Sequence, residues 1–83
     1  MSTSPETRTD DRLITLISRW LARHAGNAEL RNGLAEIGVE GLEPGQIEAV
    51  QELREQVERT EPGKRGELEM IARETLEAFV LGE

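Results

Sequence analysis

The side chains that most often carry out covalent chemistry are scarce in this chain. It has three serines, one histidine and no cysteine. Ser2 and Ser4 fall in a polar N-terminal stretch, and Ser18 falls on the outer flank of a predicted helix. Nucleophilic catalysis needs a hydroxyl or thiol beside a base that a third group orients. The spacing provides no such set, so we expect no catalytic residue and no enzymatic activity.

Metal and cofactor chemistry is equally unsupported by the sequence. His24 is the only histidine, and a metal site needs several ligands close together. The dense Asp/Asn/Gly pattern of a calcium loop is absent, and GKRG at 63–66 lacks the spacing of a phosphate-binding loop. We therefore expect no metal and no cofactor. Near the end of a helix, His24 is expected to cap carbonyls or to pack against the core.

Carboxylates are the one abundant functional group, and they follow a helical row. Glu48, Glu52, Glu55 and Glu58 are predicted along the outer side of one helix. Without an apolar pocket around them they remain ordinary surface acids. Such a row suits docking to a basic protein surface, where opposite charge speeds the encounter. The alternative is an acidic surface that only keeps the protein soluble.

The net charge of −7 over 83 residues is unevenly distributed along the chain. Residues 1–35 hold five bases and four acids, whereas residues 36–83 hold five bases and 13 acids. Binding to a phosphate backbone needs clustered cations, so nucleic acid is not an expected partner. Arg12, Arg19 and Arg23 form a stripe on a predicted helix. This stripe is a docking strip, a solvated face, or a set of cations that pair with the acidic helix.

Apolar periodicity predicts four helices after a polar N-terminal tail at residues 1–9, which we expect to be disordered. The first helix spans 11–25, with Asp10 or Asp11 as its N-cap and Gly26 as a left-handed stop. A second, shorter helix spans 27–37, capped by Asn27. Gly33 weakens this helix, so the segment could be partly loop.

The third helix is the best marked. Pro44 stands at its first position, and Leu42 and Ile47 are placed for a hydrophobic staple, with Gln46 at the third position. Pro62 ends the helix at about residue 59. A flexible basic link at 63–66 leads to the last helix, 67–81.

On the last helix, Met70 and Leu81 lie nearly opposite the apolar face. They indicate either a second contact surface, such as a dimer seam, or scattered surface residues of the ordinary kind.

These elements predict one all-α domain at residues 10–83, a small bundle of three longer helices and one short one. The chain has neither an apolar run long enough for a bilayer nor an N-terminal signal pattern, so we expect a cytoplasmic protein without membrane contact. The predicted core is apolar throughout and comprises Leu13, Ile17, Trp20, Leu21, Leu34, Ile37, Ile47, Val50, Leu53, Val57, Leu68, Ile71, Leu76 and Phe79.

The segment EIGVEGL at 36–42 stands directly before the acidic helix. Glu36, Gly38, Glu40 and Leu42 match in type the D-x-G-x-D-S-L motif that opens the second helix of acyl and peptidyl carrier proteins. The chain resembles that family over about residues 11–81, if two extra residues at 44–45 are allowed. Further matches in type are Ile47, Glu48, Leu53, Val57, the segment 60–62, Leu76 and Phe79.

The resemblance implies an acyl-carrier-like four-helix topology and a role as a docking partner of biosynthetic enzymes. Gly41 stands where the family has the serine that carries phosphopantetheine, and glycine has no hydroxyl to attach that arm. Gly41 is equally explained as a turn residue with positive φ. The partner-binding residues expected on the acidic helix and its approach are Glu40, Glu43, Glu48, Glu52 and Glu55.

Two functional hypotheses follow from the sequence. The first is a non-catalytic carrier-like module that presents its acidic helix to a basic partner surface in acyl-chain, polyketide or peptide biosynthesis. The second is an acidic regulatory protein, such as an antitoxin or inhibitor, that masks a basic and possibly nucleic-acid-binding partner.

Overall fold

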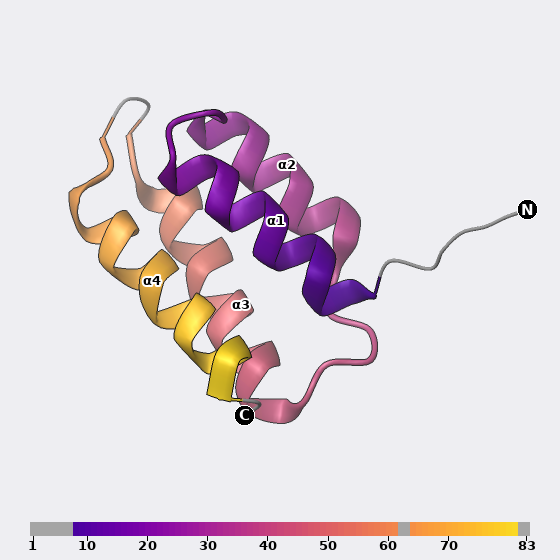
Figure 1. The fold of residues 1–83 in the computed structure, drawn as a ribbon. Coiled ribbons are helices and arrows are strands. Elements are labelled where there is room, and N and C mark those ends of the chain that lie inside the picture. The colour runs from indigo at the N-terminus through magenta and orange to yellow at the C-terminus, as the bar shows by residue number, and fades with distance from the viewer. Residues whose placement is uncertain (1–7, 62–63, 82–83) are drawn as a thin grey trace, which may run out of the picture.

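The computed structural model describes residues 8–61 and 64–81, and this part of the chain consists of helices and connections without a strand (Figure 1). The four helices are α1 (Thr9–Leu21), α2 (Asn27–Ile37), α3 (Pro44–Arg59) and α4 (Gly66–Leu81). The predicted all-α bundle with one short helix is confirmed, α2 being the shortest at 11 residues. The predicted disordered tail lies outside the described residues except for Arg8 and Thr9, and Thr9 already belongs to α1.

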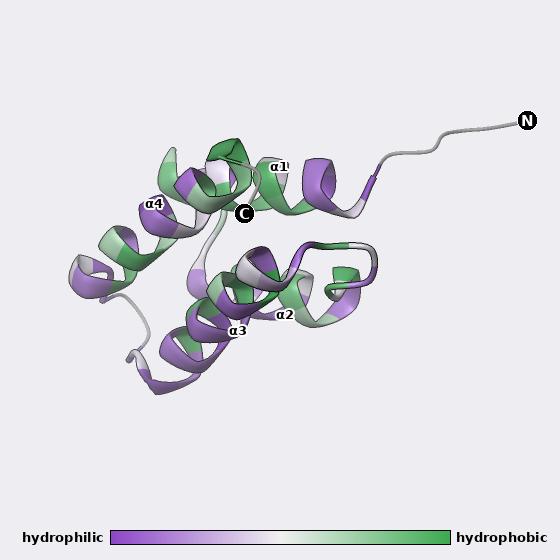
Figure 2. Cartoon of the chain, turned by 90° about the horizontal axis from the view of Figure 1, so that it is seen from below, coloured by the Kyte–Doolittle hydropathy of each residue, from purple (hydrophilic) through white to green (hydrophobic). Residues whose placement is uncertain are grey.

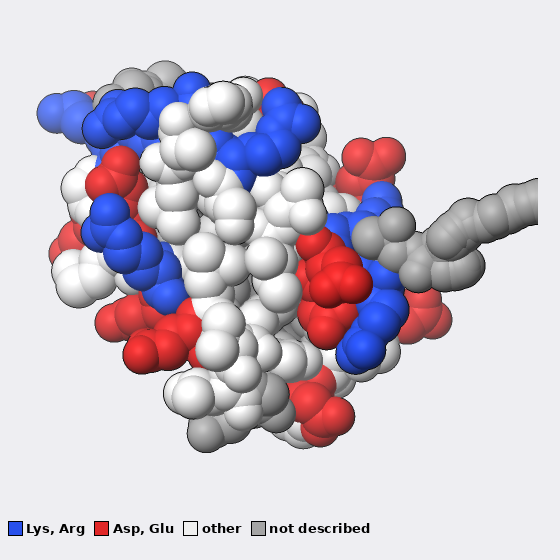
Figure 3. Space-filling view, in the orientation of Figure 1, with Lys and Arg blue, Asp and Glu red and all other residues white. Residues whose placement is uncertain are grey.

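The helices form a ring in which each packs against its neighbours along the chain and α1 closes on α4. Figure 1 shows that they alternate in direction, so two turns lie at one end of the bundle: residues 22–26, and residues 60–61 with 64–65 between α3 and α4. The 38–43 loop, the start of α1 and the end of α4 lie at the other end. Viewed on the face of α1 and α4, uncharged side chains form a stripe with charged groups on both sides (Figure 3).

Helix α1 begins earlier and ends earlier than its sequence predicts. Arg8 is its N-cap. Asp10 and Asp11 lie in the first turn, where their negative charges interact favourably with the helix dipole. At the other end Arg23, not Gly26, adopts the left-handed conformation, with φ 67°. The backbone N–H of Arg23 donates to the Trp20 carbonyl and that of His24 donates to the Arg19 carbonyl. This pair of bonds is a Schellman motif with arginine in the position where glycine is usual.

Helix α2 runs without interruption through Gly33, so the partly looped alternative is wrong. Gly26 is its N-cap, and Asn27 is its first residue instead of its cap. A Cβ on Gly33 would lie 2.6 Å from Cδ2 of Leu16, so the absence of a side chain lets α1 and α2 approach each other here.

The ends of α3 agree with prediction, and α4 starts one residue earlier than expected. Pro44 occupies the first turn of α3, and the Glu43 backbone N–H donates to Oε1 of Gln46 over 2.9 Å. This bond holds one half of a capping box. The side chain of Gln46 is buried as a result, although glutamine is usually exposed.

The core combines apolar side chains from all four helices. Most of the predicted core is confirmed, but Leu21, Ile37, Ile47, Ile71 and Leu76 are only half-buried. Leu30, Ala25 and Ala72, which the prediction left out, complete the buried interior instead. The buried apolar set is Leu13, Ile17, Trp20, Ala25, Leu30, Leu34, Val50, Leu53, Val57, Leu68, Ala72 and Phe79.

Figure 2, in which residues are coloured by hydropathy, shows that α3 is mainly hydrophilic and that α4 contains more hydrophobic residues. Among the described residues, no helix combines the length and apolar character needed to cross a bilayer.

Candidate functional site

The outer face of α3 carries the glutamate row that the sequence predicts. Glu48, Glu52 and Glu55 are all exposed and follow each other at i, i+4 and i+7. At 1.5 Å per residue their Cα atoms span about 10 Å along the helix. The ion pairs found among the described residues involve Asp10, Glu29 and Glu69, and none involves an α3 glutamate. The row is therefore not neutralised by cations within the described chain.

Glu40 and Glu43 continue the acidic surface into the 38–43 loop, where both are exposed. Between them Gly41 has φ 83°, a left-handed backbone conformation that favours glycine. The turn-residue interpretation of Gly41 therefore agrees with its backbone. The five predicted partner-binding residues form a band from this loop along α3, and they do not converge on a pocket.

An open depression on the α3 surface lies beside this band. Gln51, Arg54, Glu55 and Glu58 line it. Its walls are polar and its floor belongs to the helix itself, so it lacks the apolar enclosure of a small-molecule site. The α3 face is better suited to contact with another surface than to enclosure of a ligand.

The fold collects the acidic excess at one end of the bundle. The half next to the 38–43 loop comprises residues 8–15, 33–51 and 74–81, with eight acids and two bases, hence a charge of −6. The half next to the two turns comprises residues 16–32, 52–61 and 64–73, with seven acids and eight bases, hence +1. The imbalance along the bundle axis arises because acids cluster in the 38–43 loop and in the helix ends beside it.

The arginine stripe of α1 pairs with helices other than α3. Arg19 lies 3.6 Å from Glu29 of α2, and Arg23 lies 3.8 Å from Glu69 of α4. The expected pairing with the acidic helix α3 is wrong, because α1 and α3 sit diagonally in the ring and do not contact each other. Arg19 and Glu29 are more than half exposed, so their pair contributes little to stability.

His24 lies exposed in the turn after α1, so it does not pack against the core. Its backbone N–H, not its imidazole, caps the helix. Within residues 8–61 and 64–81, no group of three metal-ligating side chains comes together.

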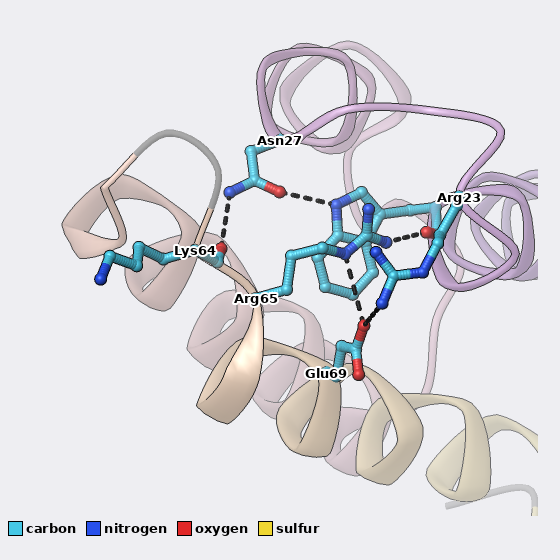
Figure 4. A network of polar contacts seen from close by, with 6 residues as sticks. Arg23, Asn27, Lys64, Arg65 and Glu69 are labelled. Atoms are coloured by element: carbon cyan, nitrogen blue, oxygen red, sulfur yellow. Dashed lines mark hydrogen bonds and ion pairs between the residues drawn. The ribbon is translucent and has the colours of Figure 1, made fainter.

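The most tightly connected polar residues lie at the end of the bundle away from the 38–43 loop (Figure 4). The Trp20 indole N–H donates to Oδ1 of Asn27 over 2.8 Å, and the Asn27 amide donates to the Lys64 carbonyl over 3.0 Å. Arg65 stacks on the Trp20 ring, and its guanidinium donates to the Trp20 carbonyl. Glu69 lies 3.4 Å from Nε of Arg65, without hydrogen-bond geometry, and also pairs with Arg23.

The sequence did not predict this network, because its local pattern indicates a helix cap at Asn27 and a flexible link at Arg65. The prediction of a flexible link is wrong at Arg65, whose side chain is only 17% exposed. The available signal was Trp20 itself, since a buried indole N–H requires an acceptor. The network joins the two turns and does not contribute to the glutamate band.

Comparison of the chain with protein-family models, with curated protein sequences and with solved structures finds no match in any of the three. The described part of the chain is a small four-helix bundle with a row of exposed glutamates on α3.

Proposed function

We propose that this domain is a non-catalytic docking module that presents the outer face of α3 to a basic surface on a partner protein. The observation that carries the proposal is the row of Glu48, Glu52 and Glu55, which is exposed and forms no ion pair among the described residues.

The rigidity of α3 supports this use. Its inner side is fixed in the core by Val50, Leu53 and Val57, and Pro44 and Gln46 define its start. The backbone positions of the three glutamates are therefore held in a line before the partner arrives, which lowers the entropic cost of binding. A complementary surface would present cations over a span of about two helical turns, roughly 10 Å. Long-range attraction would raise the association rate and would weaken with salt.

The resemblance of the 36–42 segment to carrier proteins extends this proposal to biosynthetic partners in the cytoplasm. In such a role the chain would act through recognition alone, because Gly41 offers no hydroxyl for a phosphopantetheine arm. Glu40 and Glu43, which flank Gly41 in and beside the loop, would widen the contact beyond α3.

The test is a salt-dependent capture of partners by tagged variants. The double variant E48K/E55K reverses two charges of the row, and E29K/E36K makes the same change with the same spacing on α2. The docking proposal expects wild type and E29K/E36K to retain a partner at low salt and to lose it at high salt, with E48K/E55K failing to bind. Circular dichroism confirms that all three are folded. Equal retention by E48K/E55K and wild type would reject α3 as the docking face.

A second candidate function is favoured by the charge of −6 at one end of the bundle. An acidic regulator could cover the cationic groove of a nucleic-acid-binding protein, as an antitoxin or inhibitor does. In that case the captured partner would bind nucleic acid alone and release it when the bundle is added. A captured partner that has no basic groove would exclude this function.

A further inference from the structure

The exposed apolar side chains of this bundle are concentrated on one helix. Among the described residues, the large hydrophobic side chains classed as exposed are Met70, Val80 and Leu81, which are 54%, 82% and 64% exposed. All three belong to α4. The other helices expose no comparable group in the described chain, so chance scatter over the surface is a poor explanation.

Two of these residues, Met70 and Val80, belong to a seam of four residues with the spacing of a helix–helix contact. Met70, Arg73, Glu77 and Val80 follow each other at intervals of three, four and three residues, the pattern of a packing seam in a coiled coil. At 100° per residue they occupy an arc of about 80°. This arc lies on the side of α4 opposite Leu68, Ala72, Thr75 and Phe79, which are buried in the bundle.

The two charges in the middle of the seam are without partners among the described ion pairs. Arg73 and Glu77 are both exposed, and neither takes part in a pair within 4.0 Å. Their order, with the base four residues before the acid, is the less favourable one for pairing within a helix. The seam therefore offers one base and one acid for contact with another molecule.

We propose that α4 is a self-association surface on which a second copy of this chain packs its own α4 in antiparallel orientation. A two-fold axis beside residue 75 brings Met70 against Val80 of the second copy, and Val80 against its Met70. The same axis brings Arg73 against Glu77 of the second copy, and Glu77 against Arg73 of the second copy. Apolar groups thus meet apolar groups at both ends, and opposite charges meet in the middle.

Charge complementarity identifies the occupant as a second copy in this orientation. Along the chain the seam presents an apolar residue, a base, an acid and an apolar residue. Two copies of this order match base with acid only when they run in opposite directions. A parallel pair would place Arg73 against Arg73 and Glu77 against Glu77. Symmetric contacts of this kind are the commonest way in which identical chains associate. The inference is independent of the α3 docking face, which lies on another helix.

Each copy carries a charge of −7, so the association is opposed by long-range repulsion and becomes stronger as salt screens it. An α3-bound complex would show the opposite salt dependence, which separates the two proposals experimentally.

The first experiment uses cysteine cross-linking, for which the absence of native cysteine leaves a clean background. In the antiparallel arrangement, residues 70 and 80 of different copies face each other. Two copies of residue 70 lie about 15 Å apart along the helices, beyond the reach of a disulfide. A mixture of M70C and V80C is therefore expected to form covalent dimers under mild oxidation, whereas each variant alone remains a monomer on a denaturing gel. Efficient cross-linking of M70C alone would overturn the antiparallel register.

The second experiment exchanges the charges and measures mass by sedimentation velocity. R73E and E77R each place like charges together twice in the dimer and are expected to weaken association about tenfold. The double variant R73E/E77R, and an equimolar mixture of the two single variants, are expected to recover dimers. R54E and E58R make the same changes at the same spacing on α3 and serve as matched controls that leave the mass unchanged. A monomeric wild type at several hundred micromolar, or equal dimer strength in R73E and wild type, would overturn the proposal.

Discussion

The guanidinium carbon of Arg65 lies 4.0 Å from the centroid of the Trp20 ring, although the two residues are 45 positions apart. Trp20 is in the last turn of α1, and Arg65 immediately precedes α4. The cation–π contact and the hydrogen bond to the Trp20 carbonyl therefore hold together the start of α4 and the end of α1. Contacts between α1 and α4 close the ring of helices, so the contact between Trp20 and Arg65 stabilises this closing interface.

We predict that Arg65→Lys lowers the free energy of unfolding by about 1–2 kcal/mol. Lysine keeps the positive charge but cannot stack a planar group on the indole while donating to the Trp20 carbonyl. Urea denaturation followed by circular dichroism measures the loss. Lys64→Arg makes the reverse change at the adjacent exposed position and is expected to have little effect. Equal stability of Arg65→Lys and wild type would show that only the charge matters.

Asn27→Ala is predicted to destabilise the bundle by about 1–2 kcal/mol, because it leaves the buried Trp20 indole N–H without its acceptor. Trp20 is the only tryptophan, so its fluorescence reports this site alone. We expect a change in its emission wavelength in the folded variant. Asn32→Ala, at an exposed position of the same helix, should leave the emission unchanged and should not destabilise the protein, because alanine has the higher helix propensity. An unchanged emission spectrum in Asn27→Ala would contradict the hydrogen bond.

Arg23→Gly should stabilise the protein, by about 0.5–1 kcal/mol, because glycine adopts the left-handed conformation of this residue without steric cost. The substitution also removes the pair with Glu69, but Arg23 is 73% exposed and such a pair contributes little. Arg31→Gly, within α2, is the control and should destabilise by about 1 kcal/mol. A destabilised Arg23→Gly variant would mean that the loss of the Glu69 contact exceeds the gain from relieving the left-handed conformation of Arg23.

The close contact of Gly33 with Leu16 is testable by a double-mutant cycle. In a Leu16→Ala background, Gly33→Ala should stabilise α2 by about 1 kcal/mol through helix propensity. In the wild-type background the new methyl group meets the Leu16 side chain, and the gain should shrink or reverse. Thermal or urea unfolding of the four proteins gives the coupling energy. A coupling energy near zero would show that Leu16 moves aside freely.

Gly41→Ala is expected to cost about 1–2 kcal/mol, since alanine is strained at φ 83° even though a Cβ meets no atom within 4 Å. Gly66→Ala is the control, because Gly66 also has open space around its Cβ position but begins a helix without positive φ. It should be neutral or slightly stabilising. The comparison, made by urea denaturation, isolates backbone strain from side-chain contacts. A neutral Gly41→Ala would refute the turn-residue explanation.

The sequence predicted the helices well where local signals were strong. Pro44, Gln46 and Pro62 mark both ends of α3, and apolar periodicity identified its inner face. The end of α1 was misplaced because a glycine at 26 offered the usual stop signal, whereas Arg23 supplied the left-handed turn. Arg23 adopts a backbone conformation that is unfavourable for arginine, and conformational propensities alone cannot predict such a residue.

The candidate site was predictable as a surface but not as a set of contacts. Exposure of Glu48, Glu52 and Glu55 follows from their angular position on a helix whose other side is apolar. The ion-pair partners of Arg19 and Arg23 depend on which helices lie beside α1, and the order of the helices around the ring decides this. The Trp20 network depended on two turns meeting in space, which no local pattern encodes.

The order of helices around the ring also has a consequence for how fast the chain finds its structure. Three of the four helix–helix interfaces join elements that are consecutive in the sequence, and only the α1–α4 interface joins its two ends. Proteins dominated by such short-range contacts reach the native state in microseconds to milliseconds, because little loop entropy is lost before contacts form. We expect hairpin-like pairs of helices to form first and the joining of α1 with α4 to be the late event that commits the chain.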